Sequence, residues 1–381
     1  MALDSGTVSS SSAAAPVKPE AQAVLNLLRQ NHNVLISGPP GTGKSRLLAQ
    51  VAQGFMHRAG GPAYMKRSRI AIPASATPPP YLPSPTRVDR ELFWTTMYSG
   101  SKPRDLLRGV VPGIDPTASG ALRFEVTKGT LYQASEHALS ADGAALLIVD
   151  ELNRGPAVAV FGPSIVALEG DKRLGLSGKP TPSTQFFQML DDQGHSQEYA
   201  LPAHLYVLAA MNQADTSVEG IDVAFLRRFA PFQLEPMEPV LLQHFGLATA
   251  TLPAGSPANA GDVYSLLILA WRRVNERLSL GRGPEYQIGH GVLMVEAAPP
   301  SNLPEALEYA ARGWQKVRQH LDEVFFGDTR GVGEVLAAGR SGSPYKVVDL
   351  TFASQPVVQL KGPVRPVGSD LTALMRAVAE S

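Results

Sequence analysis

One loop of this chain limits its fold more than any other segment. It follows an apolar segment at 33–37 (NVLIS) and precedes helical periodicity from Lys44 to Met56, and it reads Gly38-Pro39-Pro40-Gly41-Thr42-Gly43-Lys44-Ser45. The order G-x-x-x-x-G-K-S between a strand and a helix lets backbone amides surround phosphates at the positive end of the helix. In such a loop Lys44 reaches the β and γ phosphates and Ser45 ligates Mg²⁺. We therefore expect a nucleotide site within an α/β fold.

A second apolar segment ends in two acids. Residues 144–149 (AALLIV) are followed directly by Asp150 and Glu151. At the end of a buried strand, Asp150 would complete the Mg²⁺ coordination and Glu151 would orient or deprotonate the attacking water. The structural alternative is a pair of acids that cap the helix expected at 156–169.

A third apolar segment, at 205–211, leads to Asn212. We expect it to form the strand beside the one that ends at Asp150, so that the Asn212 amide positions water and contacts the γ phosphate. A turn-forming asparagine is the alternative. Arg227 and Arg228 follow and suit insertion into a neighbouring subunit's site, where they would stabilise charge on the transferred phosphoryl group. Surface ion pairing is the other interpretation.

Apolar segments alternate with helical patterns over the first part of the chain, which predicts a parallel sheet with right-handed crossovers. Besides those above, strands are expected at 88–98 and helices at 21–28 and 130–139, with a hairpin and loop within 173–200. From Phe232 onward the pattern is mainly helical, at 239–245, 263–280 and 304–324, and the tail reads as a hairpin and a short helix. The expected boundaries are a disordered leader at 1–18, a core at 19–233, a helical lid at 234–338 and a C-terminal extension at 339–381.

Composition excludes some classes of function. Lysine plus arginine and aspartate plus glutamate both total 34, so bulk charge gives no sign of a dedicated double-stranded DNA binder. No apolar run approaches the roughly 18 to 20 residues of a membrane span. The absence of cysteine excludes disulfides and thiolate metal sites but leaves oxygen-liganded Mg²⁺ possible. A cytoplasmic protein without a membrane partner is expected.

Four weaker features have bland alternatives. Residues 59–86 change composition sharply and read as an inserted loop. Within it, the basic residues at 65–69 suit a nucleic acid backbone or a solvated loop, and the prolines at 78–85 suit a partner or a stiff linker. Lys102 and Arg104 fall where ring NTPases often place pore-facing loops. His290 is more typical of a packed histidine than of a nucleotide contact.

Together, these segments resemble the McrB-type AAA+ NTPases, the motor subunits of modification-dependent restriction systems. The resemblance is co-linear from Asn33 to Leu336. Residues 148–154 (IVDELNR) are similar to the family's I-I-D-E-I-N-R, and 211–217 (MNQADTS) to its M-N-T-A-D-R-S. Residues 286–290 (YQIGH) resemble F-x-I-G-H, and 321–328 (LDEVFFGD) resemble L-x-E-Y-F-x-D.

The resemblance implies an AAA+ αβα sandwich with a parallel sheet (a P-loop NTPase) and a small helical lid, assembled into hexameric rings. Asn212 would be the sensor asparagine, Arg227 and Arg228 the arginines that act in trans, and Asp215 a residue of the interface or the site. The chain departs from the family at Thr216, which replaces an arginine, and in its 59–86 segment. It also begins almost at the core, so DNA recognition is expected in another subunit.

The leading expectation is a ring NTPase that hydrolyses ATP or GTP with Mg²⁺ and powers a McrC-like nuclease or another effector, in DNA restriction or defence against phage. DNA contact would run through the partner or the pore loops. A MoxR-like chaperone that remodels a protein partner is the alternative, and a non-hydrolysing scaffold is a third possibility. Nothing in the residues separates guanine from adenine.

Overall fold

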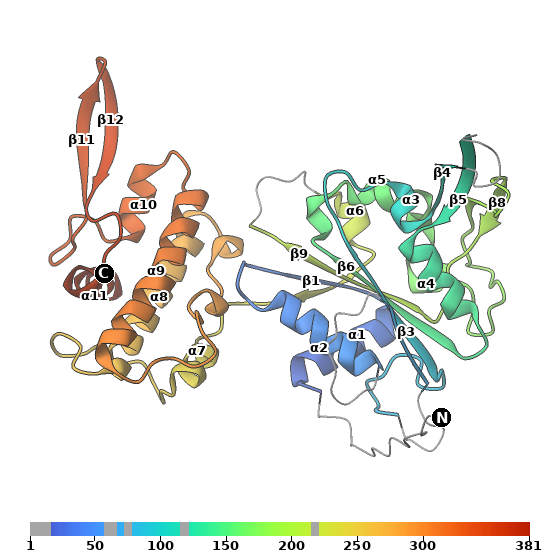
Figure 1. Ribbon diagram of the computed structural model, residues 1–381, viewed down its shortest axis with the longest axis horizontal. Helices are drawn as coiled ribbons and strands as arrows, with labels where there is room; N and C mark the ends of the chain where they lie inside the picture. The colour runs from blue at the N-terminus through green and yellow to red at the C-terminus, as the bar shows by residue number, and fades with distance from the viewer. Residues whose placement is uncertain (1–16, 57–66, 72–77, 115–121, 215–220) are drawn as a thin grey trace, which may run out of the picture. The chain divides into compact units, whose positions relative to one another are not determined.

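Contacts divide the chain into two units in the computed structural model, which describes residues 17–56, 67–71, 78–114, 122–214 and 221–381. The first unit takes in most of the chain up to Phe232 (Figure 1). The second consists of Gln233–Ser381 together with Gly38–Gly43 and the end of the strand that finishes at Asn212.

A central sheet organises the first unit. Its five principal strands are β1 (Asn33–Gly38), β3 (Asp89–Thr96), β6 (Gly143–Asp150), β9 (Leu205–Asn212) and β10 (Ala230–Gln233). They lie in the order β10-β1-β9-β6-β3, which is fifth, first, fourth, third and second along the chain. Strand β6 pairs in parallel with both β3 and β9. It is apolar without alternation because both of its faces are buried, as in other parallel sheets.

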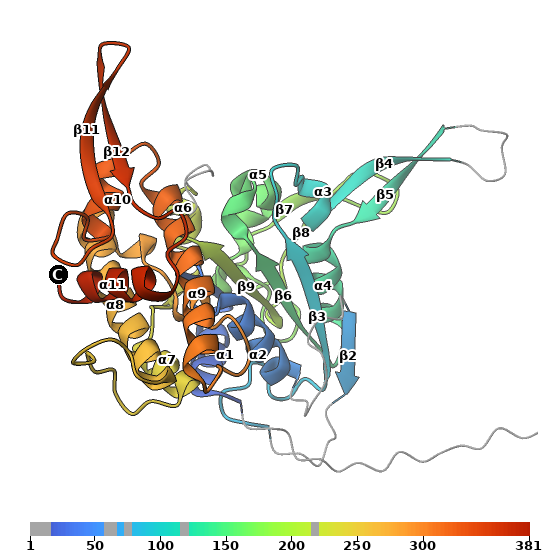
Figure 2. The ribbon, with the colours of Figure 1, turned by 60° about the vertical axis from the view of Figure 1, so that its left-hand side comes forward.

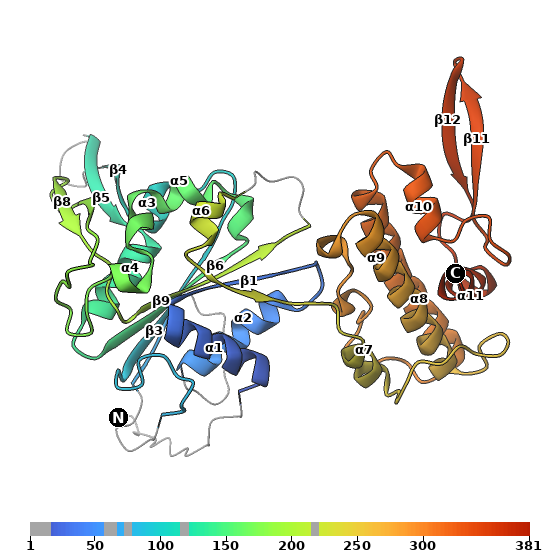
Figure 3. The ribbon, with the colours of Figure 1, turned by 180° about the vertical axis from the view of Figure 1, so that it is seen from behind.

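Helices cover both faces of this sheet (Figure 3). Helices α1 (Pro19–Asn31) and α2 (Lys44–Met56) pack together on one face, and α4 (Thr130–Leu139) packs against β3 and β6 on the other. Each helix buries an apolar stripe at helical spacing, such as Leu47, Leu48, Val51 and Phe55 on α2. The predicted α/β sandwich with a parallel sheet is confirmed.

The 59–86 segment is more than an inserted loop. Within it, β2 (Arg67–Ala71) pairs antiparallel with β3 and extends the sheet at its edge. The sequence did not predict this strand because its basic residues hide the usual apolar pattern. Charged residues are a common composition for an edge strand, where they discourage pairing with another chain. The remainder of the basic patch at 65–69 and the residues at 72–77 lie outside the described ranges.

Two hairpins extend from the first unit. The hairpin β7 (Phe187–Leu190)–β8 (Ser196–Tyr199) was expected within 173–200, whereas β4 (Arg108–Ile114)–β5 (Leu122–Lys128) was not. Figure 2 shows β4 and β5 running away from the sheet. Arg108, whose side chain is buried, joins the two hairpins: it donates to the Leu190 carbonyl (2.9 Å) and to the Asp192 carboxylate.

The helix expected at 156–169 is broken. Residues Ala157–Phe161 form α5, and Gly162–Ala167 continue as a 3₁₀ helix (η2). The break falls at Gly162-Pro163, where Gly162 has a φ of 50° and proline cannot donate a backbone hydrogen bond. Two further 3₁₀ turns, at Leu152–Arg154 (η1) and Gly170–Lys172 (η3), flank this segment. The helix α3 (Pro103–Leu106) precedes β4, and α6 (Val223–Leu226) follows β9.

The second unit is helical, with α7 (Glu238–Phe245), α8 (Ala260–Gly281), α9 (Leu303–Val324), α10 (Thr329–Val335) and α11 (Gly368–Ala379). The side chains of Asn259, Asn302 and Asp328 cap the N-termini of α8, α9 and α10. One hydrophobic core joins Trp271 of α8, Trp314 of α9 and Leu371 of α11, so the tail packs with the helices before it. The hairpin β11 (Lys346–Phe352)–β12 (Gln355–Lys361) lies between α10 and α11 in sequence.

Among the residues that the structure describes, no helix has the length and apolar character needed to cross a bilayer.

Candidate nucleotide-binding site

The phosphate loop lies between β1 and α2, as the sequence predicted. Gly41 and Gly43 have φ values of 78° and 90°, in the left-handed region that favours glycine. The Thr42 hydroxyl donates to the Pro39 carbonyl (2.8 Å) and closes the turn. The helix begins at Lys44, so the amides of the first turn of α2 face the end of this loop and carry the positive end of its dipole.

Lys44 lies beside both predicted acids. Burial lowers the pKa of its ammonium to about 8, and the opposing charges of Glu151 and then Asp150 act to raise it. These electrostatic contacts place the start of α2 at the sheet edge where β6 ends. Strands β1 and β9 also begin at the same end of the sheet, because the Val207 amide near the start of β9 donates to the His32 carbonyl just before β1 (2.9 Å). The lysine and the two carboxylates thus meet at one end of the parallel strands.

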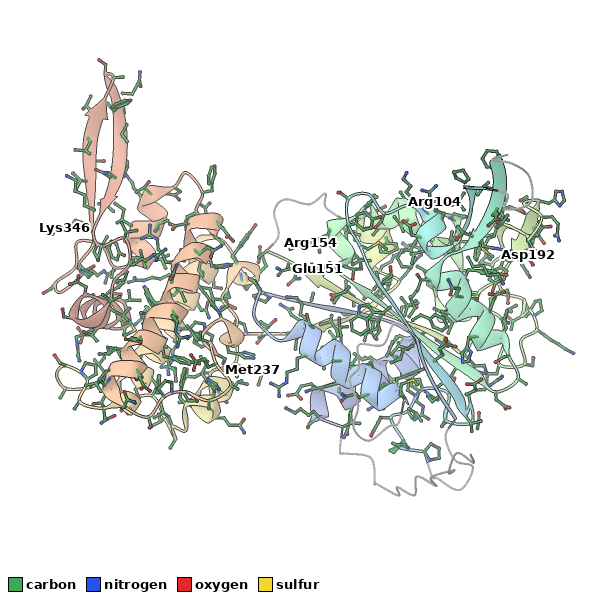
Figure 4. All side chains as sticks on the ribbon, viewed as in Figure 1. Arg104, Glu151, Arg154, Asp192, Met237 and Lys346 are labelled. Atoms are coloured by element: carbon green, nitrogen blue, oxygen red, sulfur yellow. The ribbon has the colours of Figure 1, made fainter. Side chains whose placement is uncertain are left out.

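The acidic pair occupies the end of β6 in an unusual backbone conformation. The Met97 amide donates to the Asp150 carbonyl (2.9 Å), which holds the strand end. Glu151 then has a φ of 52°, and its amide donates to the Asp150 carboxylate (3.0 Å). Its Oε2 lies 3.3 Å from Arg154 Nε (Figure 4). Oε2 is buried and has no hydrogen bond within the described chain, because its geometry toward Arg154 is not that of a hydrogen bond.

The oxygen ligands present suit Mg²⁺. Ser45 is exposed at the start of α2 and Asp150 is half-buried at the end of β6. Over the described ranges, no group of three or more histidine, cysteine, aspartate or glutamate side chains forms a metal cage. Mg²⁺ in phosphate-binding enzymes is usually held by one or two protein oxygens, with phosphates and waters completing its octahedron. A hydroxyl and one carboxylate therefore fit Mg²⁺ better than they fit a metal ion that needs three or more protein ligands.

Asn212 is the last residue of β9, the strand that lies between β1 and β6 in the sheet. Asn212 is half-buried and has an interaction with the rest of the chain. The register pairs Val149 of β6 with Ala209 of β9, so β9 extends two residues beyond the level of Asp150 before it ends at Asn212. The neighbouring signature residues Asp215, Thr216 and Ser217 lie outside the described residues.

The structure separates the two adjacent arginines. Arg228 is mostly buried: its Nε donates to the Ile165 carbonyl (3.0 Å), another guanidinium nitrogen donates to the Ala224 carbonyl, and Glu169 lies 3.7 Å away. Arg227 is exposed, and no hydrogen bond or ion pair of its side chain occurs with the described part of the chain. The sequence could not distinguish them, because the difference depends on which carbonyls lie within reach.

In the second unit, a short strap contacts the phosphate loop. The Gly289 amide donates to the Pro40 carbonyl (2.8 Å) and the Gly291 amide to the Gly41 carbonyl (2.9 Å). A side chain at position 41 would meet Val292 at 2.7 Å, so the approach requires glycine. His290, between these glycines, accepts a hydrogen bond from the Met237 amide (3.3 Å). Sequence reasoning weighed the histidine but missed its glycine neighbours, although the run Gly289-His290-Gly291 was visible.

Lys102 and Arg104 flank the start of α3, next to the β4–β5 hairpin (Figure 4). The Lys102 amide donates to the Asp105 carboxylate (2.7 Å), which caps the short helix. Lys102 is exposed and Arg104 half-buried. Both therefore lie at the base of the hairpin.

Comparisons with known proteins agree with this geometry. A family model described as an AAA domain matches residues 28–159. The McrB subunit of a type IV methyl-directed restriction enzyme (EcoKMcrB) from Escherichia coli (strain K12) is 23% identical over 216 residues, 56% of this chain and 38% of that protein. The YdiS component of the type II restriction enzyme BsuMI from Bacillus subtilis (strain 168) is 36% identical over 92 residues, 24% of this chain and 26% of that protein. The matches thus cover well under half of each relative.

Similar solved structures include NtrX from Brucella abortus, at 13% identity and a TM-score of 0.30, covering 85% of this chain and 65% of that one. The C. elegans protein PCH-2 is 11% identical, with a TM-score of 0.28, covering 83% of this chain and 64% of that one.

The matched domain, the strand order and the glycine loop with its lysine define a P-loop NTPase of the AAA+ class. Two similar proteins are components of restriction systems. Within the AAA+ class, the chain is similar to the McrB subunit over 56% of its own length.

Proposed function

We propose that this chain hydrolyses ATP or GTP with Mg²⁺ in a site that two neighbouring copies share in a hexameric ring. The observation that carries the proposal is the meeting of Lys44 with Asp150 and Glu151 at the end of the sheet. Arg227 supports the sharing of the site between two copies, since an exposed arginine without a partner in the described chain is available to a neighbouring copy.

Each residue of the site has a distinct proposed role. The backbone N–H groups of Gly41–Gly43 and of the first turn of α2 bind the phosphates, and Lys44 neutralises the β and γ phosphates. Ser45 and Asp150 hold Mg²⁺, which polarises the phosphate oxygens when bound. Glu151 takes a proton from the attacking water through its Oε2, which has no hydrogen bond within the described part of the chain. Asn212 orients that water from the adjacent strand.

Arg227 supplies the charge that the cis residues lack. The transferred phosphoryl group gains negative charge as the bond to the leaving oxygen breaks, and a guanidinium stabilises that charge. Because this arginine comes from the next copy, hydrolysis requires assembly. Arg228 is assigned a supporting role, because its guanidinium is already bound to carbonyls of its own chain.

We assign the work of the ring to a restriction-type effector. The similarity to restriction-system components supports a McrC-like nuclease or a comparable effector as the partner. DNA would be contacted through that partner or through the β4–β5 hairpin and the basic residues Lys102 and Arg104 at its base. Its setting would be the cytoplasm, in defence against foreign DNA.

Mixing two inactive variants tests the shared site. Lys44→Ala removes the cis lysine and Arg227→Ala removes the trans arginine, so each variant alone is expected to lose turnover. In an equal mixture about a quarter of the interfaces of a head-to-tail ring would combine an intact cis site with an intact arginine. Turnover of the mixture should therefore exceed that of either variant. Absence of recovery at every mixing ratio, with rings formed, would contradict a shared site.

A further inference from the structure

A buried polar pair lies beneath the turn that carries Arg227. Asn33, at the start of β1, is fully buried. Its Nδ2 donates to the carbonyl of Arg228 (3.0 Å) and to the carbonyl of Leu168 (2.7 Å). Its Oδ1 accepts from a guanidinium nitrogen of Arg173 (2.6 Å). One amide thus links the first strand, the turn after α6 and the 3₁₀ segment at 165–173.

Arg173 completes this pair and is 1% exposed. Its Nε donates to the same Leu168 carbonyl (3.0 Å) and another nitrogen donates to the carbonyl of Leu205, at the start of β9. Burial of a guanidinium costs free energy unless its donors are satisfied, and here carbonyls and one amide satisfy them. An apolar residue would avoid that cost but would leave these acceptors without a partner.

The turn itself is fixed on its other sides. Phe225 and Phe229 are buried, and the Phe225 ring makes tilted contacts with the rings of Phe161 and Phe229, at centroid distances of 5.2 Å and 5.3 Å. The Arg228 side chain is bound to the 3₁₀ segment through Ile165. Asn33 holds the carbonyl of Arg228 from below. Arg227 lies between these fixed neighbours and is the exposed member of the turn.

We propose that Asn33 and Arg173 are positioning residues for Arg227. They set the backbone from which the Arg227 side chain projects, without touching nucleotide themselves. This inference rests on the proposed function, because it gives Arg227 its role in a neighbouring site. A displacement of about 1 Å of a catalytic group can cost about 100-fold in rate, so modest loosening of the turn should be measurable.

The same unit contains a matched control. Arg90 is also fully buried, and its guanidinium donates to four carbonyls, those of Phe55 (2.6 Å), Ser84 (3.0 Å), Arg87 (3.2 Å) and Pro83 (2.7 Å). Its hydrogen bonds do not reach the 165–173 segment or the turn after α6. Arg90→Lys and Arg173→Lys therefore make the same chemical change in similar surroundings, and only the second touches the turn.

The experiment compares turnover, nucleotide binding and thermal unfolding of the two variants in the full chain. Both are expected to lower the unfolding temperature. Arg173→Lys should also reduce the turnover of assembled rings by about 10- to 100-fold with unchanged nucleotide affinity. Mixing it with Lys44→Ala should restore activity, as for Arg227→Ala. Equal losses of turnover in Arg90→Lys and Arg173→Lys, or no recovery on mixing, would overturn the inference.

Asn33→Asp is the second variant, in case Arg173→Lys does not fold. It retains the oxygen that accepts from Arg173 but loses both donors, including the one to the Arg228 carbonyl. We expect the same trans-type loss, again recovered by Lys44→Ala. Normal turnover in Asn33→Asp would overturn the inference while leaving the shared site intact. Normal turnover in Arg227→Ala would instead remove the shared site itself, and the positioning role with it.

Discussion

The two halves of the proposed catalytic site are held in different ways. The cis half, at the ends of β1 and β6, consists of strand ends and a glycine loop, with a partly buried lysine and a glutamate oxygen without a hydrogen bond in the described chain. The trans half, the turn with Arg227 and Arg228, is anchored by aromatic rings and by a buried amide and guanidinium. Chemical groups that act on nucleotide are left available in both halves, and the trans half is also held by a fully buried pair of side chains from other elements.

This difference follows from where each half is placed in the fold. The strand ladder reaches Asp150, the residue before Glu151. The arginine turn follows a helix of only four residues and precedes β10. Backbone hydrogen bonds form within the turn, and the Asn33 side chain adds one to the Arg228 carbonyl from another element. Substitutions in the cis half should therefore change chemistry, and substitutions of the buried side chains that hold the turn should change both chemistry and stability.

The largest effect is expected from Glu151→Gln. The amide keeps the size of the carboxylate but cannot accept a proton from water, so turnover should fall by about 10²- to 10⁴-fold. Lys44 and the glycine loop are unchanged, so nucleotide should remain bound and rings should persist. Steady-state turnover and retention of labelled nucleotide are the measurements.

The control for this variant is Glu308→Gln, an equivalent change at an exposed position of α9. It should behave as the unmodified protein does. Turnover of Glu151→Gln near that of the control would refute the assignment of Glu151 as the base.

A contrast between the two arginines comes next. Arg227→Ala should cut turnover by about 10²- to 10³-fold and leave the unfolding free energy unchanged, since the side chain is exposed. Arg228→Ala removes hydrogen bonds from a side chain that is 14% exposed, which should cost about 1–3 kcal/mol of unfolding free energy. Denaturant titration and turnover assays separate the two. The comparison between halves would fail if Arg227→Ala were the destabilising variant.

The smallest effect is a pH dependence of nucleotide affinity. With a Lys44 pKa of about 8 in the protein without nucleotide, the ammonium is mostly charged at pH 7 and mostly neutral at pH 9. Phosphates bind the charged form, so affinity should be flat below pH 7 and should fall by up to about tenfold per pH unit above pH 8. Equilibrium binding from pH 7 to 9.5 measures it.

Stability without nucleotide should move in the opposite direction. The folded-state pKa of Lys44 lies below its ordinary value of 10.5, so the unfolded chain binds more protons between pH 8 and 10.5. The cost of burying the charge is therefore present below pH 8 and is relieved as pH rises through this window. Lys44→Met should abolish both dependences, and a flat affinity profile in the unmodified protein would show that the lysine is not buried as described.

The sequence predicted the elements that carry strong periodicity. Strands β1, β6 and β9 and helices α2 and α4 lie where their apolar patterns placed them, because burial on both faces of a parallel sheet dictates their composition. The sequence did not predict the hairpin β4–β5, because apolar residues such as Val110 and Phe124 are exposed in it and do not follow the pattern of a buried strand. Strand β2 was missed because its residues (RSRIA) show no apolar alternation in the sequence.

The candidate site shows the same limit. Motif spacing identified the residues at the strand ends, because the type of each residue indicates its role. The structure brings Lys44, Asp150 and Glu151 together. Spacing could not assign Arg227 and Arg228 separately, and it gave no reason to connect Asn33 with a turn far away in sequence. Such connections depend on carbonyl positions, which no residue type encodes.

The backbone of Glu151 has a consequence for the whole molecule. A non-glycine residue in the left-handed region costs about 1–3 kcal/mol, a sizeable share of the 5–15 kcal/mol that keeps a typical domain folded. A glycine would remove most of that cost but would have no carboxylate. The residue best suited to stability and the residue needed for hydrolysis are therefore different at this position. A stabilised version of this protein, selected for thermal resistance alone, would tend to lose its activity here first.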